Sequence, residues 1–85
     1  MYLLDLQAGG VIRNLEREIR YPLHVSGIKV GTYIADHQFY WVATGVFQCE
    51  DVKSRATITP LYRRNKKHMM IEHGITVIEV FKPNE

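Results

Sequence analysis

The sequence has few of the features that mark secreted or membrane-spanning proteins. Cys49 is the one cysteine among 85 residues, which excludes an internal disulfide and a zinc site with several cysteines. Apolar runs extend over only a few residues, so the sequence contains no candidate membrane span. The start, Met-Tyr-Leu-Leu-Asp, lacks the basic region and the cleavage site of a secretory signal. We therefore expect a cytoplasmic protein that does not contact a membrane.

Acidic residues are missing from one long segment, 53–71. The same segment holds six basic residues: Lys53, Arg55, Arg63, Arg64, Lys66 and Lys67. The rest of the chain has five basic and nine acidic residues, a balance of −4 against a total of +2. A basic block beside an acidic body is typical of a polyanion-binding face, and a solvated helix face explains it equally well.

The length and the hydrophobic fraction of 46% predict a single small domain, 1–85, with a modest core. Apolar periodicity and turn residues predict two helices, 2–8 and 60–73, and four strands, 19–25, 28–42, 46–52 and 75–81. Thr59 and Pro60 give the second helix a good start, and Gly74 gives it a natural end. The order α-β-β-β-α-β predicts an α/β (α+β) mixed sheet whose last two strands are parallel.

Several packing expectations follow from this assignment. Pro22 favours an edge position or a bulge for the first strand, and the last strand is expected to be buried on both faces. In the second helix, Tyr62 and Met69 share one side at about 100° per residue, with the basic side chains opposite. Cys49 and the apolar residues Met69, Met70 and Ile71 are expected in the core.

Asp36, Asp51 and Lys53 are candidate catalytic residues. Asp51 and Lys53 are two apart at a strand end and therefore point to the same side, whereas Glu50 and Val52 point to the other. If the strands before and after Gly45 form a hairpin, Asp36 lies across the ladder from Asp51. Two acids and a lysine in apolar strands need a shared partner, and Mg²⁺ accepts one or two carboxylates together with substrate phosphates and water. This arrangement suits phosphodiester hydrolysis, with the basic helix following the phosphates through Arg55, Arg63, Arg64, Lys66 and Lys67.

At this point the chain resembles the PD-(D/E)XK superfamily of restriction-like nucleases, through Asp36, the stretch Glu50-Asp51-Val52-Lys53, and the α-β-β-β-α-β order. It is more closely similar to a family of small phage-encoded nucleases, some of which are like Holliday-junction resolvases. The matching stretches are Gly10-Val11-Ile12-Arg13-Asn14-Leu15, Tyr33-Ile34-Ala35-Asp36, Glu50-Asp51-Val52-Lys53-Ser54 and Thr59-Pro60-Leu61-Tyr62-Arg63. They cover most of the chain, in order and at consistent spacing.

The resemblance implies a restriction-endonuclease-like αβββαβ core and a Mg²⁺- or Mn²⁺-dependent endonuclease that leaves 5′-phosphate and 3′-hydroxyl ends. Asp36 and Asp51 would be metal ligands, the backbone carbonyl of Val52 a third ligand, and Lys53 the catalytic lysine. Glu50 would supply a second metal or hydrogen-bond contact. The implied partner is DNA, branched in the manner of a Holliday junction, in a bacterial host cell that carries the phage or prophage.

Two positions depart from the family. The first helix of the family is usually longer, and its upstream part carries a glutamate that can join the metal site. This chain begins too late to contain that glutamate, so we expect a truncated first helix. The explanations are that Met1 is an internal start, that the site works with fewer acids, or that the protein binds without cutting. Glu18 stands where a glutamine is expected, and a charge facing the site would change it.

The same residues also have structural explanations that involve no catalysis. Asp36 could form a surface salt bridge with Arg55 or Lys53. The four histidines form no HxH, HExxH or i, i+4 pair with a ligand, so no zinc site is assigned. The aromatic strand residues Tyr33, Phe39, Tyr40 and Trp41 favour sheet packing or a homodimer interface over base stacking. A homodimer would give a four-way junction the two active sites that its symmetry requires. The alternative functions are a non-catalytic nucleic-acid-binding protein of the same fold and a small interaction protein whose acids form surface ion pairs.

Overall fold

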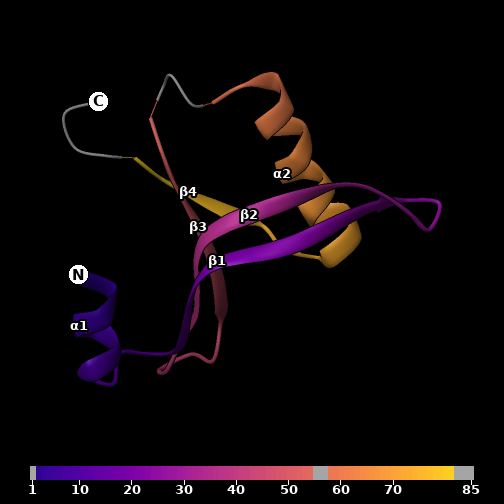
Figure 1. The fold of residues 1–85 in the computed structure, drawn as a ribbon. Coiled ribbons are helices and arrows are strands. Elements are labelled where there is room, and N and C mark those ends of the chain that lie inside the picture. Colours follow the sequence, from indigo (N-terminus) through magenta and orange to yellow (C-terminus); the bar gives the residue numbers. More distant parts are fainter. Residues whose placement is uncertain (1, 55–57, 82–85) are drawn as a thin grey trace.

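A computed structural model describes residues 2–54 and 58–81 of the chain. Its elements follow the order α1 (Tyr2–Ala8), β1 (Ile12–Val25), β2 (Ile28–Trp41), β3 (Phe47–Lys53), α2 (Pro60–His73) and β4 (Val77–Phe81). The fold is therefore a mixed α+β fold with two helices and one four-stranded sheet, as expected from the sequence (Figure 1).

The sheet has the strand order β1-β2-β3-β4. β1, β2 and β3 are antiparallel neighbours, and β4 runs parallel to β3, so the predicted parallel pair is confirmed. The crossover between these two strands contains α2, whose predicted ends are also confirmed. Thr59 Oγ1 accepts a hydrogen bond from the Tyr62 backbone N–H at 3.1 Å, and Gly74 adopts φ 67°, a left-handed conformation that suits glycine.

The first hairpin is much longer than the sequence suggested. β1 begins at Ile12, whereas the alternation of apolar residues predicted a start at residue 19. The missed half is rich in charge and has little apolar periodicity, but it pairs with β2 from Ile12–Trp41 to Arg17–His37. The hairpin tip is tight, because Ser26 and Gly27 have φ 51° and 79° between the paired residues Val25 and Ile28.

Two residues of β1 other than glycine have left-handed backbone conformations. Asn14 has φ 57° where the pairing register shifts, and Glu18 has φ 53° between Arg17 and Ile19. Such left-handed residues within a strand are uncommon for residues other than glycine. Pro22 lies on β1, which is an edge strand, and this confirms the expected edge position.

Two apolar clusters hold the helices against the sheet. α2 covers a core that consists of Leu23, Tyr33, Ala35, Cys49, Tyr62, Met69 and Val77. α1 covers a smaller one of Leu3, Ile12 and Phe39. Figure 1 shows the two helices at opposite ends of the long hairpin, with α2 beside its distal half. The predicted core positions Cys49 and Met69 are confirmed, at 1% and 0% exposure.

Three expectations about burial were wrong. Met70 and Ile71 are 53% and 76% exposed, because they lie on other sides of α2 than its buried residues Tyr62 and Met69. The last strand begins at Val77 rather than at residue 75, and it is not buried on both faces. β4 is an edge strand, and Ile78, Val80 and Phe81 remain exposed.

The aromatic residues of β2 pack mainly within the chain. Tyr33 and Phe39 are 5% and 1% exposed, and Trp41 packs edge-on against Phe39 with ring centroids 5.4 Å apart. Packing within the chain therefore accounts for the burial of Tyr33 and Phe39. Within the described residues, neither helix has the length and apolar character needed to cross a membrane.

Candidate active site

Asp36 and Asp51 lie where the ladder between β2 and β3 ends. The paired residues run from Tyr40–Phe47 to His37–Glu50, and the two aspartates follow immediately. There the Asp36 backbone N–H donates to Asp51 Oδ1 at 3.0 Å, and the Val52 N–H donates to Asp36 Oδ2 at 2.8 Å. Each carboxylate thus accepts a hydrogen bond from the backbone of the opposite strand, and the two side chains continue the ladder in place of carbonyl groups.

Asp51 is the most deeply buried charged side chain at this point, with 2% exposure. Its burial raises the pKa of the carboxyl group, while the hydrogen bond from Asp36 and the charge of Lys53 act in the opposite direction. Lys53 Nζ lies 3.8 Å from Asp51 Oδ2 and 4.1 Å from the ring centroid of Tyr62. The ammonium group is therefore held between a carboxylate and an aromatic face, which is a favourable position for a cation.

Asp51 and Lys53 are open to solvent on one side. A surface hollow of about 300 Å³ is lined by Thr32, Tyr33, Ile34, Asp51, Lys53, Thr59, Leu61, Tyr62 and Asn65. It is bounded by β2, by the end of β3 and by the first turns of α2. Asp51 and Lys53 thus reach a space that a ligand can enter, although Asp51 itself is almost completely shielded.

The structure brings together three of the residues expected at the site: Asp36, Asp51 and Lys53. It does not bring in Glu50, whose Oε2 accepts from Gln48 Nε2 at 2.6 Å. Gln48 in turn accepts a hydrogen bond from Trp41 Nε1 at 2.9 Å, so Glu50 belongs to a separate polar chain. Arg55 lies outside the described residues. The expected salt bridge between Asp36 and Arg55 lies outside them as well.

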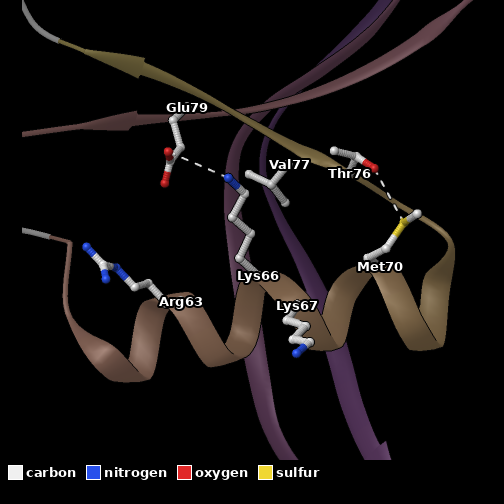
Figure 2. A pocket seen from close by; sticks show the side chains of 7 residues that line it. All are labelled: Arg63, Lys66, Lys67, Met70, Thr76, Val77 and Glu79. Atoms are coloured by element: carbon white, nitrogen blue, oxygen red, sulfur yellow. Dashed lines mark hydrogen bonds and ion pairs between the residues drawn. The ribbon is translucent and has the colours of Figure 1, made fainter.

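The basic side chains of α2 do not form one face. Arg63, Lys66 and Lys67 line a hollow between α2 and β4, together with Met70, Thr76, Val77 and Glu79 (Figure 2). Arg64 lines a different hollow, on the side of the helix that faces β1 and β2. Tyr62 and Met69 are buried, whereas Arg63, Arg64 and Lys67 are exposed. This confirms the prediction that these basic residues lie on the side of α2 away from Tyr62 and Met69.

Glu79 is a neighbour of the site that the sequence analysis did not identify. It is the register partner of Asp51 on β4, and its Oε1 lies 3.6 Å from Lys66 Nζ. Tyr62 lies close to both strands, and its buried hydroxyl makes no hydrogen bond of normal geometry to a described residue. Burial, together with the nearby Glu79 carboxylate, raises the pKa of Tyr62. The signal that could have identified Glu79 is that it is the single acid in an otherwise apolar strand.

The donor atoms present fit a hard divalent cation with a sparse protein shell. Carboxylate and carbonyl oxygens are the ligands of Mg²⁺, which accepts one or two carboxylates and keeps several waters. Asp36 Oδ1 has no hydrogen-bond partner among the described residues, and Asp51 Oδ2 faces only the Lys53 ammonium at 3.8 Å. Within the part of the chain that the structure describes, no group of three or more histidine, cysteine or acidic side chains is placed so that it could hold a metal ion. The protein would therefore contribute at most the two aspartates and a backbone carbonyl such as that of Val52.

A second polar cluster lies at the other end of α2. Glu72 accepts hydrogen bonds from the His24 backbone N–H at 2.6 Å and pairs with His24 Nδ1 at 2.7 Å. It also pairs with His68 Nε2 at 2.9 Å and lies 3.4 Å from His73 Nε2. His68 and Glu72 are four residues apart on α2, and the structure joins them as an ion pair that the sequence analysis did not identify. This cluster ties α2 to the edge strand β1.

No family model, curated protein or solved structure matches the chain.

Proposed function

We propose that the protein is a metal-dependent endodeoxyribonuclease that hydrolyses phosphodiester bonds of branched DNA, such as a Holliday junction. The observation that carries the proposal is the meeting of Asp36, Asp51 and Lys53 at the divergence of β2 and β3, beside an open hollow. The α-β-β-β-α-β order with a parallel last pair supports it, because the resemblance implies a restriction-endonuclease-like αβββαβ core. The basic helix that follows β3 supports it further, because Arg63, Lys66 and Lys67 line a hollow that also holds Glu79, the register partner of Asp51.

The residues have distinct roles in this proposal. A bound Mg²⁺ or Mn²⁺ would lower the pKa of a coordinated water and stabilise the charge that grows on the phosphate oxygens. Asp36 and Asp51, with the carbonyl of Val52, would hold that ion. Lys53 is fixed between Asp51 and the Tyr62 ring, so its ammonium can neutralise the phosphate or orient the attacking water without reorganisation.

The test is cleavage of a labelled four-way junction and of a linear duplex with the same sequence, each with Mg²⁺, with Mn²⁺ and with EDTA. Metal-dependent cutting of the junction is the expected result. Equal cutting of both substrates would keep the nuclease and remove the preference for branched DNA. The absence of cutting with either metal would contradict the proposed activity.

The second candidate is a non-catalytic DNA-binding protein of the same fold. One observation favours it: each aspartate already accepts a backbone hydrogen bond, which is a sufficient structural reason for both acids. This candidate predicts salt-sensitive DNA binding that EDTA leaves unchanged, with no cleavage under any condition.

The remaining parts of the proposal concern the setting. A phage or prophage protein in the cytoplasm of a bacterial host would meet recombination intermediates, which are branched. A homodimer would place two active sites on the two strands of a symmetric junction. Light scattering on the purified protein tests the dimer directly, since a monomer mass would contradict it.

A further inference from the structure

The hollow beside Asp51 and Lys53 continues along α2 toward the distal half of the β1–β2 hairpin. A second hollow, of about 520 Å³, lies there, and the linings of the two hollows have Thr32, Leu61 and Asn65 in common. Figure 1 shows α2 beside this half of the hairpin. The two hollows therefore form one continuous groove, the hairpin groove, with α2 on one side and the hairpin on the other.

Gly31 leaves room along this groove. It lies in the interior of β2 opposite Leu23, and Val30 beside it is left unpaired where the register shifts. A Cβ added at Gly31 would meet no described atom within 4 Å apart from its chain neighbours, and its φ lies outside the left-handed region. A glycine inside a strand often marks a place where a ligand approaches the backbone closely. The β2 backbone is therefore accessible to a ligand in the groove.

The distal part of the groove combines an apolar lining with one cation. Val25, Val30 and Leu61 line it and are 55%, 61% and 58% exposed. Arg64 is the one lysine or arginine on this lining, which includes no acidic residue among those described. Arg64 also has no acid within salt-bridge distance among the described residues. Exposed apolar side chains around an unpaired cation suit a ligand that has both apolar faces and negative charge.

Unpaired DNA has this combination of properties. In a duplex the base faces are covered by stacking, whereas the bases of an unpaired strand can pack on aromatic or apolar side chains while the phosphates meet cations. Unpairing costs least where the bases are not held in a continuous duplex, as at a branch point. A groove of this kind beside Asp51 and Lys53 would therefore favour branched DNA over a linear duplex.

We infer that an unpaired DNA segment lies in the hairpin groove, with its bases on the apolar side chains around Gly31 and a phosphate at Arg64. This inference rests on the proposed function for the identity of the ligand, since DNA is the polymer on which the candidate site would act. It adds a binding site for the nucleotides that adjoin the phosphate at Asp51 and Lys53.

The test measures binding of a labelled single-stranded oligonucleotide in EDTA over a series of salt concentrations. Gly31→Leu fills the groove and should weaken binding about tenfold, which corresponds to the lost contact of one base, and Gly31→Ala should weaken it less. Arg64→Ala should lower the slope of log affinity against log salt by about 0.7, as expected for one phosphate of a single strand. Lys29→Ala is the matched comparison and should leave the slope unchanged, because Lys29 is an exposed cation of the same hairpin that lines neither part of the groove.

Leu61→Glu gives a second way to block the groove, should Gly31→Leu not fold. Leu61 is exposed, lines both parts of the groove and lies in the first turn of α2, where an acidic residue is favourable for the helix. The variant should therefore fold and bind the oligonucleotide more weakly than the wild type. Thermal unfolding of every variant shows whether a loss of binding comes from a loss of folding.

The outcomes separate this inference from the proposed function. Wild-type binding that Gly31→Leu, Leu61→Glu and Arg64→Ala leave unchanged would overturn the groove, and cutting of the four-way junction would still establish the nuclease. An equal loss of slope in Arg64→Ala and Lys29→Ala would overturn it as well, because binding would then reflect charge in general. Groove-dependent binding by a protein that never cuts would support the inference and contradict the proposed activity. Absence of salt-dependent binding by the wild type would overturn the inference.

Discussion

Asp36 and Asp51 exchange hydrogen bonds with the backbone of each other's strands, at 3.0 Å from the Asp36 N–H to Asp51 Oδ1 and at 2.8 Å from the Val52 N–H to Asp36 Oδ2. Both carboxylates therefore stabilise the pairing of the two strands, in addition to any catalytic role. A substitution at either position therefore tests two roles at once, and the choice of replacement decides which role is removed.

The first prediction separates those roles at Asp51. Asp51→Ala leaves the Asp36 N–H without its acceptor and should lower the free energy of unfolding by about 1–3 kcal/mol. Asp51→Asn keeps an oxygen in the Oδ1 position and removes the charge, so its stability should stay close to that of the wild type. Urea unfolding measures both. Equal destabilisation by alanine and asparagine would show that the charge, rather than the hydrogen bond, holds the strands.

The second prediction concerns the unpaired hydroxyl of Tyr62. Tyr62→Phe should leave stability unchanged or raise it, because it removes a buried hydroxyl that lacks a hydrogen bond of normal geometry. Tyr62→Ala should cost about 3–5 kcal/mol, since it removes a buried ring from the core. Thermal unfolding of the two variants checks both statements. A clear loss of stability in Tyr62→Phe would mean that Glu79 does accept a hydrogen bond from this hydroxyl.

The third prediction is a pH dependence at Glu72. Hydrogen bonds from the His24 side chain and backbone, with a further one from His68, lower the pKa of Glu72 from 4.5 to about 2. A lowered pKa in the folded state means that the contact contributes its full stability above pH 4.5 and loses it as the pH falls toward 2. The other group that faces this carboxylate is His73, whose Nε2 lies 3.4 Å from Glu72 Oε2 and is also hydrogen-bonded to the Pro22 carbonyl.

The measurement for Glu72 is urea unfolding of the wild type and of Glu72→Gln across this acidic range. The difference in stability between the two proteins should be largest above pH 4.5 and should shrink as the pH approaches 2. Other carboxyl groups titrate in both proteins and cancel in the difference. A difference that stays constant with pH would contradict the role assigned to the charged carboxylate.

The fourth prediction concerns Cys49. Burial raises the pKa of its thiol to about 11, and the side chain is 1% exposed. The thiolate fraction and the access of a reagent are therefore both small at neutral pH. A disulfide reagent should react slowly with the folded protein and rapidly in denaturant. Rapid reaction of the folded protein would show that the core around Cys49 opens readily.

Much of the fold follows from local chemistry in the sequence. Thr59, Pro60 and Gly74 define the ends of α2 because capping depends on residues within one turn of the helix end. The strand β1 could not be delimited in the same way. Its first half holds left-handed residues at Asn14 and Glu18, and only pairing with β2 shows that it is a strand.

Burial along α2 depended on helical phase rather than on hydrophobicity. Ile71 follows the buried Tyr62 by nine residues, and at about 100° per residue this places it half a turn away. The apolar side chains of Met70 and Ile71 suggested a core position that their phase does not allow. The position of a residue around the helix axis therefore decides whether it is buried in α2, and its apolar character does not.

The candidate site was predictable in part. The proximity of Asp36 and Asp51 follows from the hairpin register, and the shared side of Asp51 and Lys53 follows from the period of a strand. The backbone hydrogen bonds of the two aspartates were not predictable, because they depend on where the ladder ends. The sequence marks Glu79 as the single acid of an apolar strand, but its position opposite Asp51 was not predictable, since the sequence does not give the register between parallel strands.

The most direct test of the account is Mn²⁺-dependent cleavage of the four-way junction by the wild type and by Asp51→Asn, with the unfolding curves of both proteins measured in parallel. The account predicts cutting by the wild type and loss of cutting in Asp51→Asn, with no loss of stability. Cutting that survives in Asp51→Asn, or a wild type that binds the junction and never cuts it, would contradict it.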